Sequence, residues 1–258
     1  MTVELTDLLL LCLASFLAGF VDAIVGGGGL IQLPAALVIL PSFPVATVVG
    51  SLKIPAFSGT FVAAWQYVKK VSINWKLVAM ICTTAFLASY SGSYLLTHVS
   101  NTFMKPVLLV VLTIVAIYTY TKKDFGQKDG HDLPEKMQWQ RGFLISLIIG
   151  FYDGFIGPGA GSFLILAFIA LLHFDFLHSS AHAKLVNLAT NLGSVTLFFL
   201  KGKIIWAIAL PMAAANMAGG FAGAKLAIAK GNKFIRVFFL MVVVGILIRF
   251  CWDVFGKR

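Results

Sequence analysis

The chain alternates between long apolar runs and short polar turns. In the first half, the apolar runs cover about residues 5–25, 29–40, 45–68, 75–97 and 106–121. About 20 apolar residues cross the hydrocarbon core of a bilayer, so the first, third and fourth runs are predicted to span a membrane and the fifth nearly does. The second run has only twelve residues, which predicts a half-helix that begins at the glycines in front of it.

Those glycines are the most informative stretch of the first half. Gly26, Gly27, Gly28 and Gly29 are consecutive, and they follow Asp22 by about one helical turn. An unpaired backbone N–H or C=O costs several kcal/mol inside a bilayer, so such a break is tolerated only where it lines a cavity or packs against protein. The stretch predicts a binding site. The competing interpretation is that the glycines only allow close helix packing.

The second half repeats the first at an offset of 131 residues. Six of the fourteen positions from 15 to 28 are identical in both copies: Ser15, Gly19, Phe20, Asp22, Gly26 and Gly28. We interpret this as an internal duplication, with a first membrane repeat at 1–121, a polar cytoplasmic linker at 122–141 and a second repeat at 142–258. Transporters are commonly built from such repeats, with the binding site where the copies meet.

The expected fold is an all-α polytopic membrane protein with about eight spanning helices and short half-helices after the glycine breaks. If the first two runs make an even number of crossings, the repeats are inverted; if they form one broken crossing, they are parallel. We favour inversion because the run 5–25 spans a bilayer alone. The side that carries Lys69, Lys70 and the linker is rich in basic residues and hence cytoplasmic, which puts both termini in the periplasm.

Composition excludes a water-soluble fold. Hydrophobic residues make up 59% of the 258 residues and charged residues only 12%, whereas soluble domains carry roughly 25% charged residues. The net charge of +10 is read as membrane orientation rather than as nucleic-acid binding. The three cysteines are odd in number and lack a CxxC spacing, so they imply neither a disulfide framework nor a metal site. No cofactor is expected.

Four charged residues lie deep inside apolar runs: Asp22, Lys53, Asp153 and Lys184. Charges at membrane depth are costly and usually mark a pathway or a site. We expect Lys53 and Lys184 to hold the charge of a small anion, and the aspartates to compensate charge or to carry a coupling proton. Alternatively, Asp22–Lys53 and Asp153–Lys184 are structural ion pairs.

Polar side chains continue the face on which Lys184 lies. Asn187 and Asn191 follow it at helical spacing, and the corresponding positions after Lys53 are Ala56 and Thr60. We expect Asn187, Asn191 and Thr60 to orient the solute, although the asparagines could instead join helices. The starts of the two half-helices add free N–H groups and the positive end of a helix dipole, which bind anions. The predicted backbone contacts are Gly26, Gly27, Gly28 and Gly29 in the first break and Gly157, Gly159 and Gly161 in the second.

Other chemistries find little support in the sequence. His173, His178 and His182 lie near Asp175, but loop histidines are usually solvated, and no metal site is expected. The glycine stretches follow membrane helices rather than strands, which excludes a dinucleotide loop. The chain has no HExxH or GxSxG motif, and it is not expected to be an enzyme.

The two break regions carry a family resemblance. The stretch AGFVDAIVGGGGLIQLPA at 18–35 and its echo GFYDGFIGPGAG at 150–161 resemble the sulfite exporter TauE/SafE family, and the resemblance extends over essentially the whole chain. It implies a transporter of the bacterial inner membrane whose cargo is a small sulfur-containing or organic anion, such as sulfite or a sulfonate. The site residues given above come from our interpretation of the residues and not from the family.

These observations predict a secondary transporter that moves a small anion by alternating access, with the aspartates as candidates for proton coupling. The alternative is an anion channel. The expected partners are the anionic solute and the lipid bilayer. The cargo, the direction of transport and the oligomeric state stay open at this point.

Overall fold

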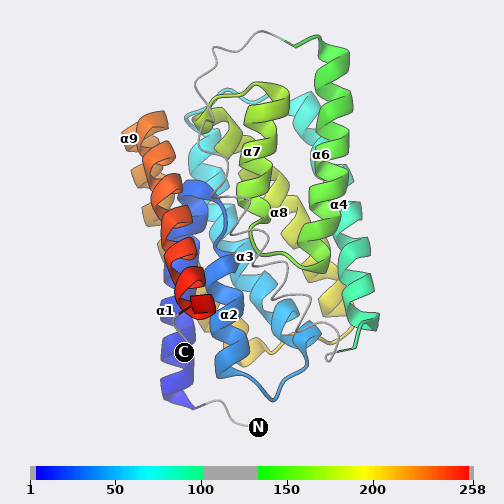
Figure 1. Cartoon of the computed structure of the whole chain (residues 1–258). Helices are drawn as coiled ribbons and strands as arrows, with labels where there is room; N and C mark the ends of the chain where they lie inside the picture. Colours follow the sequence, from blue (N-terminus) through cyan, green and yellow to red (C-terminus); the bar gives the residue numbers. More distant parts are fainter. Residues whose placement is uncertain (1–3, 101–132, 256–258) are drawn as a thin grey trace.

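The computed structural model describes residues 4–100 and 133–255, and its regular elements there are all α-helices (Figure 1). In the first half these are α1 (Leu5–Val25), α2 (Gly29–Ile39), α3 (Val45–Val68) and α4 (Trp75–His98). In the second half they are α6 (Glu135–Phe155), α7 (Ala160–Leu172), α8 (Phe176–Leu200) and α9 (Trp206–Phe255). The predicted run 106–121 lies outside the described residues. The predicted linker is helical from Glu135 onward.

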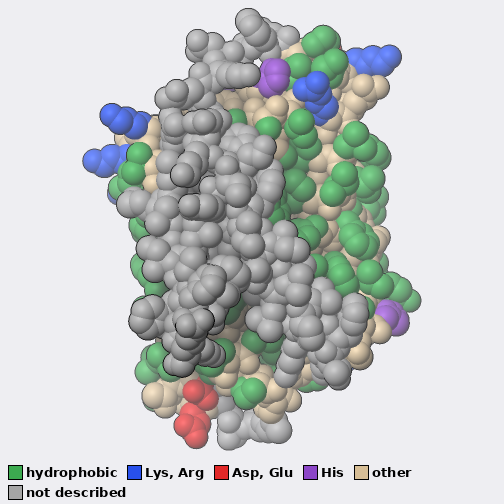
Figure 2. Space-filling model, in the orientation of Figure 1, with side chains coloured by type: hydrophobic (Ala, Val, Ile, Leu, Met, Phe, Trp, Pro, Cys, Tyr) green, Lys and Arg blue, Asp and Glu red, His purple; other side chains and the backbone are tan. Residues whose placement is uncertain are grey.

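The architecture is that of a multi-pass membrane protein, as the sequence predicted. Five of the described helices are long and apolar enough to cross a bilayer: α1, α3, α4, α8 and the Trp206–Ile235 part of α9. The short apolar helices α2 and α7 are the two half-helices expected after the breaks. Hydrophobic side chains cover much of the flank of the molecule between its two ends (Figure 2), which is the surface that lipid tails solvate best.

Positive φ angles explain why each full helix ends where it does. Gly26 has φ 68° and Gly27 has φ 106°, and in the second break Gly157 has φ 92° and Gly159 has φ 83°. These angles are sterically unfavourable for residues that carry a Cβ atom but open to glycine. The chain therefore leaves α1 and α6, makes a tight break, and starts a short helix.

Close packing of small residues joins the two halves. A Cβ atom on Gly19 of α1 would lie 2.4 Å from the carbonyl oxygen of Asn216 in α9, and one on Gly223 would lie 2.3 Å from that of Phe20. The same kind of contact joins α4 to α6, where a Cβ on Gly92 would lie 2.2 Å from the carbonyl oxygen of Phe151. The first helix of each half thus packs against a later helix of the other half, through residues small enough for the backbones to approach.

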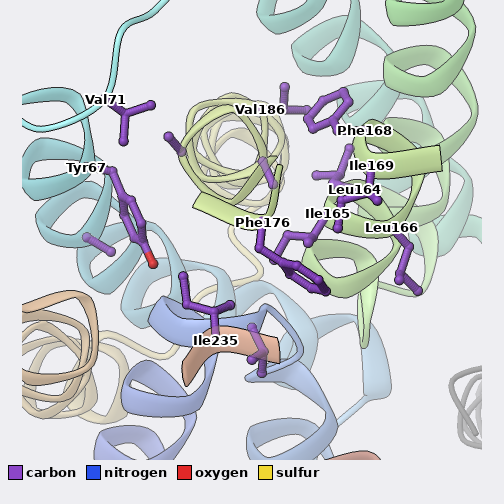
Figure 3. Close-up of a cluster of buried hydrophobic side chains, with 14 of the residues drawn as sticks. Tyr67, Val71, Leu164, Ile165, Leu166, Phe168, Ile169, Phe176, Val186 and Ile235 are labelled. Carbon is purple, nitrogen blue, oxygen red and sulfur yellow. The ribbon is translucent and has the colours of Figure 1, made fainter. Parts of the chain in front are cut away.

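Two apolar clusters flank the breaks. One of them joins α7 to α8 and α3, and Figure 3 shows Leu164 and Phe168 of α7 beside Phe176 and Val186 of α8, with Tyr67 of α3 on the other side. The second cluster lies around α2 and the first turns of α3 and includes Leu33, Val49, Leu52 and Ile156. The breaks therefore lie in the interior of the protein.

The helices of the two halves run in opposite directions. Figure 1 shows α1 beginning at the lower end, where α2 also ends, and α6 beginning at the upper end. Near the start of α3, a Cβ on Gly50 would lie 2.4 Å from the carbonyl oxygen of Lys203, just after α8, so α3 and α8 are antiparallel. Adding 131 to the first residues of α1, α2, α3 and α4 gives 136, 160, 176 and 206, and the second-half helices begin at 135, 160, 176 and 206. This geometry agrees with inverted repeats, while the duplication itself stays a prediction.

On the face that Figure 2 shows, the two ends of the molecule differ in charge. In Figure 2, Lys and Arg side chains gather toward the upper end and acidic side chains at the lower end, where α1 follows Glu4 and carries Asp7 in its first turn. Such an imbalance is typical of a membrane protein with a fixed orientation.

Cysteine labelling tests the antiparallel arrangement of α3 and α8. Ser42 precedes α3, Ser72 follows it, Lys201 follows α8, and all three are exposed. In a background without the native cysteines, we expect a membrane-impermeant maleimide to label Ser42→Cys and Lys201→Cys from one side of the membrane. Ser72→Cys should react only from the opposite side. Joint labelling of Ser72→Cys and Lys201→Cys would instead indicate parallel repeats.

Candidate functional site

A pocket lies where the two breaks meet. It has about 620 Å³ of empty space, counting its open mouth, and residues of α1, α2, α3, α6, α7, α8 and α9 or of the breaks line it. Every residue that the sequence analysis placed at the site lines this pocket, except Lys184 and Gly26. The structure thus brings the predicted residues together, and their roles stay predictions.

The two breaks touch each other directly. A Cβ on Gly26 would lie 2.3 Å from the carbonyl carbon of Gly161, and one on Gly29 would lie 3.1 Å from Cα of Pro158. Ser162, in the first turn of α7, donates a hydrogen bond to the carbonyl oxygen of Gly26 at 2.7 Å. This contact satisfies a backbone acceptor that the break leaves without a helical partner.

Two buried ion pairs cross between the halves. Lys53 Nζ lies 2.9 Å from Asp153 Oδ1, and Lys184 Nζ lies 2.6 Å from Asp22 Oδ2. The alternative interpretation, with the ion pairs Asp22–Lys53 and Asp153–Lys184, is therefore wrong, because each lysine reaches the aspartate of the other half. Each lysine also donates to the backbone carbonyl oxygen of the same aspartate. A charge removed from water needs such a partner, since the desolvation cost of an isolated ion is several kcal/mol.

The two aspartates differ in their remaining contacts. Asp22 Oδ1 accepts hydrogen bonds from the N–H groups of Gly27 at 3.1 Å and Gly28 at 3.3 Å. Asp153 Oδ2 instead accepts from the hydroxyl of Thr190. The residue that corresponds to Gly27 in the second break is Pro158, which has no N–H to donate. Thr190 was not among the predicted residues, and no periodicity in the sequence pointed to it.

The predicted orienting residues face the pocket. Asn191 Nδ2 lies 3.4 Å from Asn187 Oδ1, and Thr190 Oγ1 lies at the same distance from that oxygen. These bonds stay within α8, so in the described part of the chain neither asparagine hydrogen-bonds to another helix. Their proposed role as interhelical links finds no support there.

Two further amides that the sequence did not single out line the pocket, Gln32 of α2 and Asn216 of α9. Gln32 Nε2 donates to Ser15 Oγ at 3.2 Å, and Asn216 Nδ2 donates to the carbonyl oxygen of Ser15 at 2.9 Å. Ser15 Oγ itself donates to the carbonyl oxygen of Met212. An amide inside an apolar run was the available signal. This network ties α1, α2 and α9 together beside the pocket.

Of the three histidines near Asp175, His178 makes a structural contact with it. Asp175 accepts from the backbone N–H of His178 at 2.8 Å and so caps the start of α8. It also contacts His178 Nδ1 at 2.7 Å. Within the residues that the structure describes, no group of three or more His, Cys, Asp or Glu side chains could hold a metal ion.

A double-mutant cycle tests the crossed pairing. Lys184→Met leaves Asp22 without its cation, and removing one partner of a buried pair costs about 3–5 kcal/mol. We expect a lower melting temperature for Lys184→Met and for Asp22→Asn, and a double variant that loses clearly less than the sum. The measurement is thermal unfolding of the detergent-purified protein.

The matched control pairs Lys184→Met with Asp153→Asn, whose effects should add because the structure gives these residues no direct contact. The reverse result, additivity with Asp22 and coupling with Asp153, would restore pairing within each half.

Comparison with known proteins agrees with this architecture. The profile of the sulfite exporter TauE/SafE family matches residues 11–250. A probable membrane transporter protein of Haemophilus influenzae is 34% identical, over 92% of this chain and 91% of its own length. The probable membrane transporter protein YfcA of Escherichia coli strain K12 is 31% identical, over 95% of this chain and 89% of its own length. No solved structure shows significant similarity. The chain belongs to the sulfite exporter TauE/SafE family of membrane transporters.

Proposed function

We propose that this protein is a secondary transporter that carries a small anion, sulfur-containing or organic, across the bacterial inner membrane by alternating access. One observation carries the proposal: a pocket with charged and amide side chains lies where two half-helices begin, deep in an apolar protein. Broken helices that meet at mid-membrane are the usual construction of a transporter site. The family and its relatives point to transport rather than to an enzymatic reaction.

The preference for an anionic solute comes from the helix backbone more than from the lysines. The two lysines and two aspartates cancel in formal charge. What remains is the positive end of two helix dipoles, since α2 and α7 both begin at the pocket. In a low-dielectric interior, such ends favour an anion over a cation. Lys53 also lines the pocket, and Thr60 supplies a hydroxyl that can orient the bound solute.

Alternating access requires contacts between the halves that can change. The crossed pairs Lys53–Asp153 and Lys184–Asp22 connect one half to the other, so a rocking motion of the halves would stretch or exchange them. Asp22 and Asp153 are also the groups of the pocket that could take up a proton, which makes them the candidates for coupling. A channel needs no such rearrangement, and it is the alternative to be tested.

The orientation proposal rests on charge. The end of the molecule where α6 begins is basic, and the end where α1 begins carries Glu4 and Asp7. By the positive-inside rule, the basic end faces the cytoplasm and α1 begins in the periplasm.

Counterflow in proteoliposomes tests the function. The panel consists of sulfite, sulfate, thiosulfate, sulfoacetate and simple carboxylates. For at least one anion, we expect saturable uptake that accelerates when the vesicles are preloaded with the same anion, because a carrier returns faster when loaded. Uptake that rises linearly with concentration and ignores preloading would indicate a channel, and absence of any flux would refute the proposal.

Threonine variants tie the flux to the pocket. Thr60→Val removes a hydroxyl that lines the pocket at nearly constant volume. Loss of one hydrogen bond of about 0.5–1.5 kcal/mol predicts roughly a two- to tenfold lower kcat/KM for uptake. Thr83→Val makes the same change on an exposed face of α4, where the hydroxyl bonds to the carbonyl oxygen of Ala79, and should leave uptake unchanged. Equal effects of both variants would remove Thr60 from the site.

A further inference from the structure

We propose that the two half-helix starts are unequal: Asp22 occupies the start of α2 as a built-in anion, and the charged group of the solute binds at the start of α7, beside Asn187 and Lys53. This inference rests on the proposed anion transport and assigns the solute to one end of the pocket. The ligand class is a small oxyanion, whose oxygen atoms can accept several N–H bonds at once.

The start of α2 is already satisfied. The carboxylate of Asp22 accepts from the N–H groups of Gly27 and Gly28 through one oxygen and pairs with Lys184 through the other. Lys184 has a side-chain exposure of 1% and does not line the pocket. The donors that would hold a solute anion at this end therefore hold Asp22 instead.

The start of α7 lacks such an occupant. Asp153 uses its two oxygens for Lys53 and Thr190, and in the described part of the chain it accepts no backbone N–H of the break beside it, in contrast to Asp22. The first N–H groups of a helix have no acceptor within the helix and carry the positive end of its dipole. Gly159, Ala160 and Gly161 line the pocket at this end. The N–H of Ala160 already donates to the carbonyl oxygen of Gly157 at 3.1 Å, so the N–H groups of Gly159 and Gly161 are the donors within reach of a bound molecule.

A buried side chain points independently to a ligand at the same place. Asn187 is 7% exposed and lines the pocket. Its Oδ1 accepts hydrogen bonds from Thr190 and Asn191, whereas its Nδ2 donates to no acceptor among the described residues. That Nδ2 lies 3.4 Å from the position a Cβ on Gly161 would take. Because Asn187 lines the pocket, an anion at the start of α7 would accept from this amide donor.

A lysine completes the site from the other side. Lys53 Nζ lies 3.5 Å from the position of a Cβ on Gly157 and lines the pocket. The corresponding place in the first half has no side-chain amide donor at this position, because the counterpart of Asn187 is Ala56. The start of α7 thus combines helix donors, an amide and the Lys53–Asp153 ion pair, whereas at the start of α2 the carboxylate of Asp22 already accepts from the backbone N–H groups.

Asp22 also affects the affinity of this site. Its Oδ1 lies 3.5 Å from the position of a Cβ on Gly161, so a solute anion at α7 binds with a second negative charge nearby. Removing the charge of Asp22 should therefore strengthen binding, whereas removing the amide of Asn187 should weaken it.

Bromide is the probe that locates the site. In crystals of the full-length chain grown with sodium bromide, anomalous scattering should show bromide within about 3.5 Å of Asn187 Nδ2 and the first N–H groups of α7. A peak beside Gly28, or none at α7, would overturn the inference.

Matched variants test the site assignment in solution. The measured quantity is the rise in melting temperature that added bromide causes at constant ionic strength. Asn187→Ala installs the residue already present at position 56 and should weaken the bromide effect at least fivefold. Ala56→Asn, the mirror change in the first half, should alter it less than twofold. Asp22→Asn should strengthen it. If Ala56→Asn strengthens the bromide effect by as much as Asn187→Ala weakens it, the two helix starts are equivalent and the inference fails. Asn187→Ser provides a second variant if Asn187→Ala impairs folding.

The outcomes for site and function are separable. A protein that binds bromide at α7 but shows no counterflow with the panel anions keeps this site and loses the proposed transport. A protein that exchanges anions with unchanged kinetics in Asn187→Ala keeps transport and loses the site.

Discussion

The structure depends on how a helix can be interrupted inside a bilayer. A break frees backbone N–H and C=O groups, and hydrocarbon offers them no partner. Here the two breaks supply partners for each other: Ser162 bonds to the carbonyl oxygens of Val25 and Gly26, and Asp22 accepts from Gly27 and Gly28. The interior pocket is the consequence, because two half-helices that start side by side direct their donors to the same volume.

The crossed ion pairs and the glycine contacts act on the same elements. Lys53 and Lys184 reach the aspartates of opposite halves, while Gly19 and Gly92 allow the outer helices to pack across the same division. Neither half can bury its charged residues alone, since the counter-ion of each lies in the other half. The halves are therefore interlocked, and any motion between them must act on buried charges and not only on apolar surface.

Much of this arrangement followed from the sequence, and the exceptions have a common cause. The predicted runs 5–25 and 45–68 coincide with α1 and α3, because length and hydropathy are local properties. The partners of Asp22 and Asp153 were predicted wrongly, because spacing along the chain does not say which helices approach. Thr190 and Asn216 were not predicted for the same reason. Thr190 matters only because Pro158 lacks an N–H. Asn216 matters only because Gly19 and Gly59 leave room for it.

The differences between the two halves say more about the number of anion sites than their similarity does. A perfectly symmetric pair of breaks would offer two equal anion sites, or none if both aspartates occupied the helix starts. Proline in place of Gly27, threonine in place of Gly59 and asparagine in place of Ala56 alter the second half at three corresponding positions. Pro158 and Thr190 draw Asp153 away from the start of α7, and Asn187 adds a donor there. On the proposed assignment, three local changes in an otherwise matched framework leave one start occupied and the other open, so that a single site would lie between the two halves.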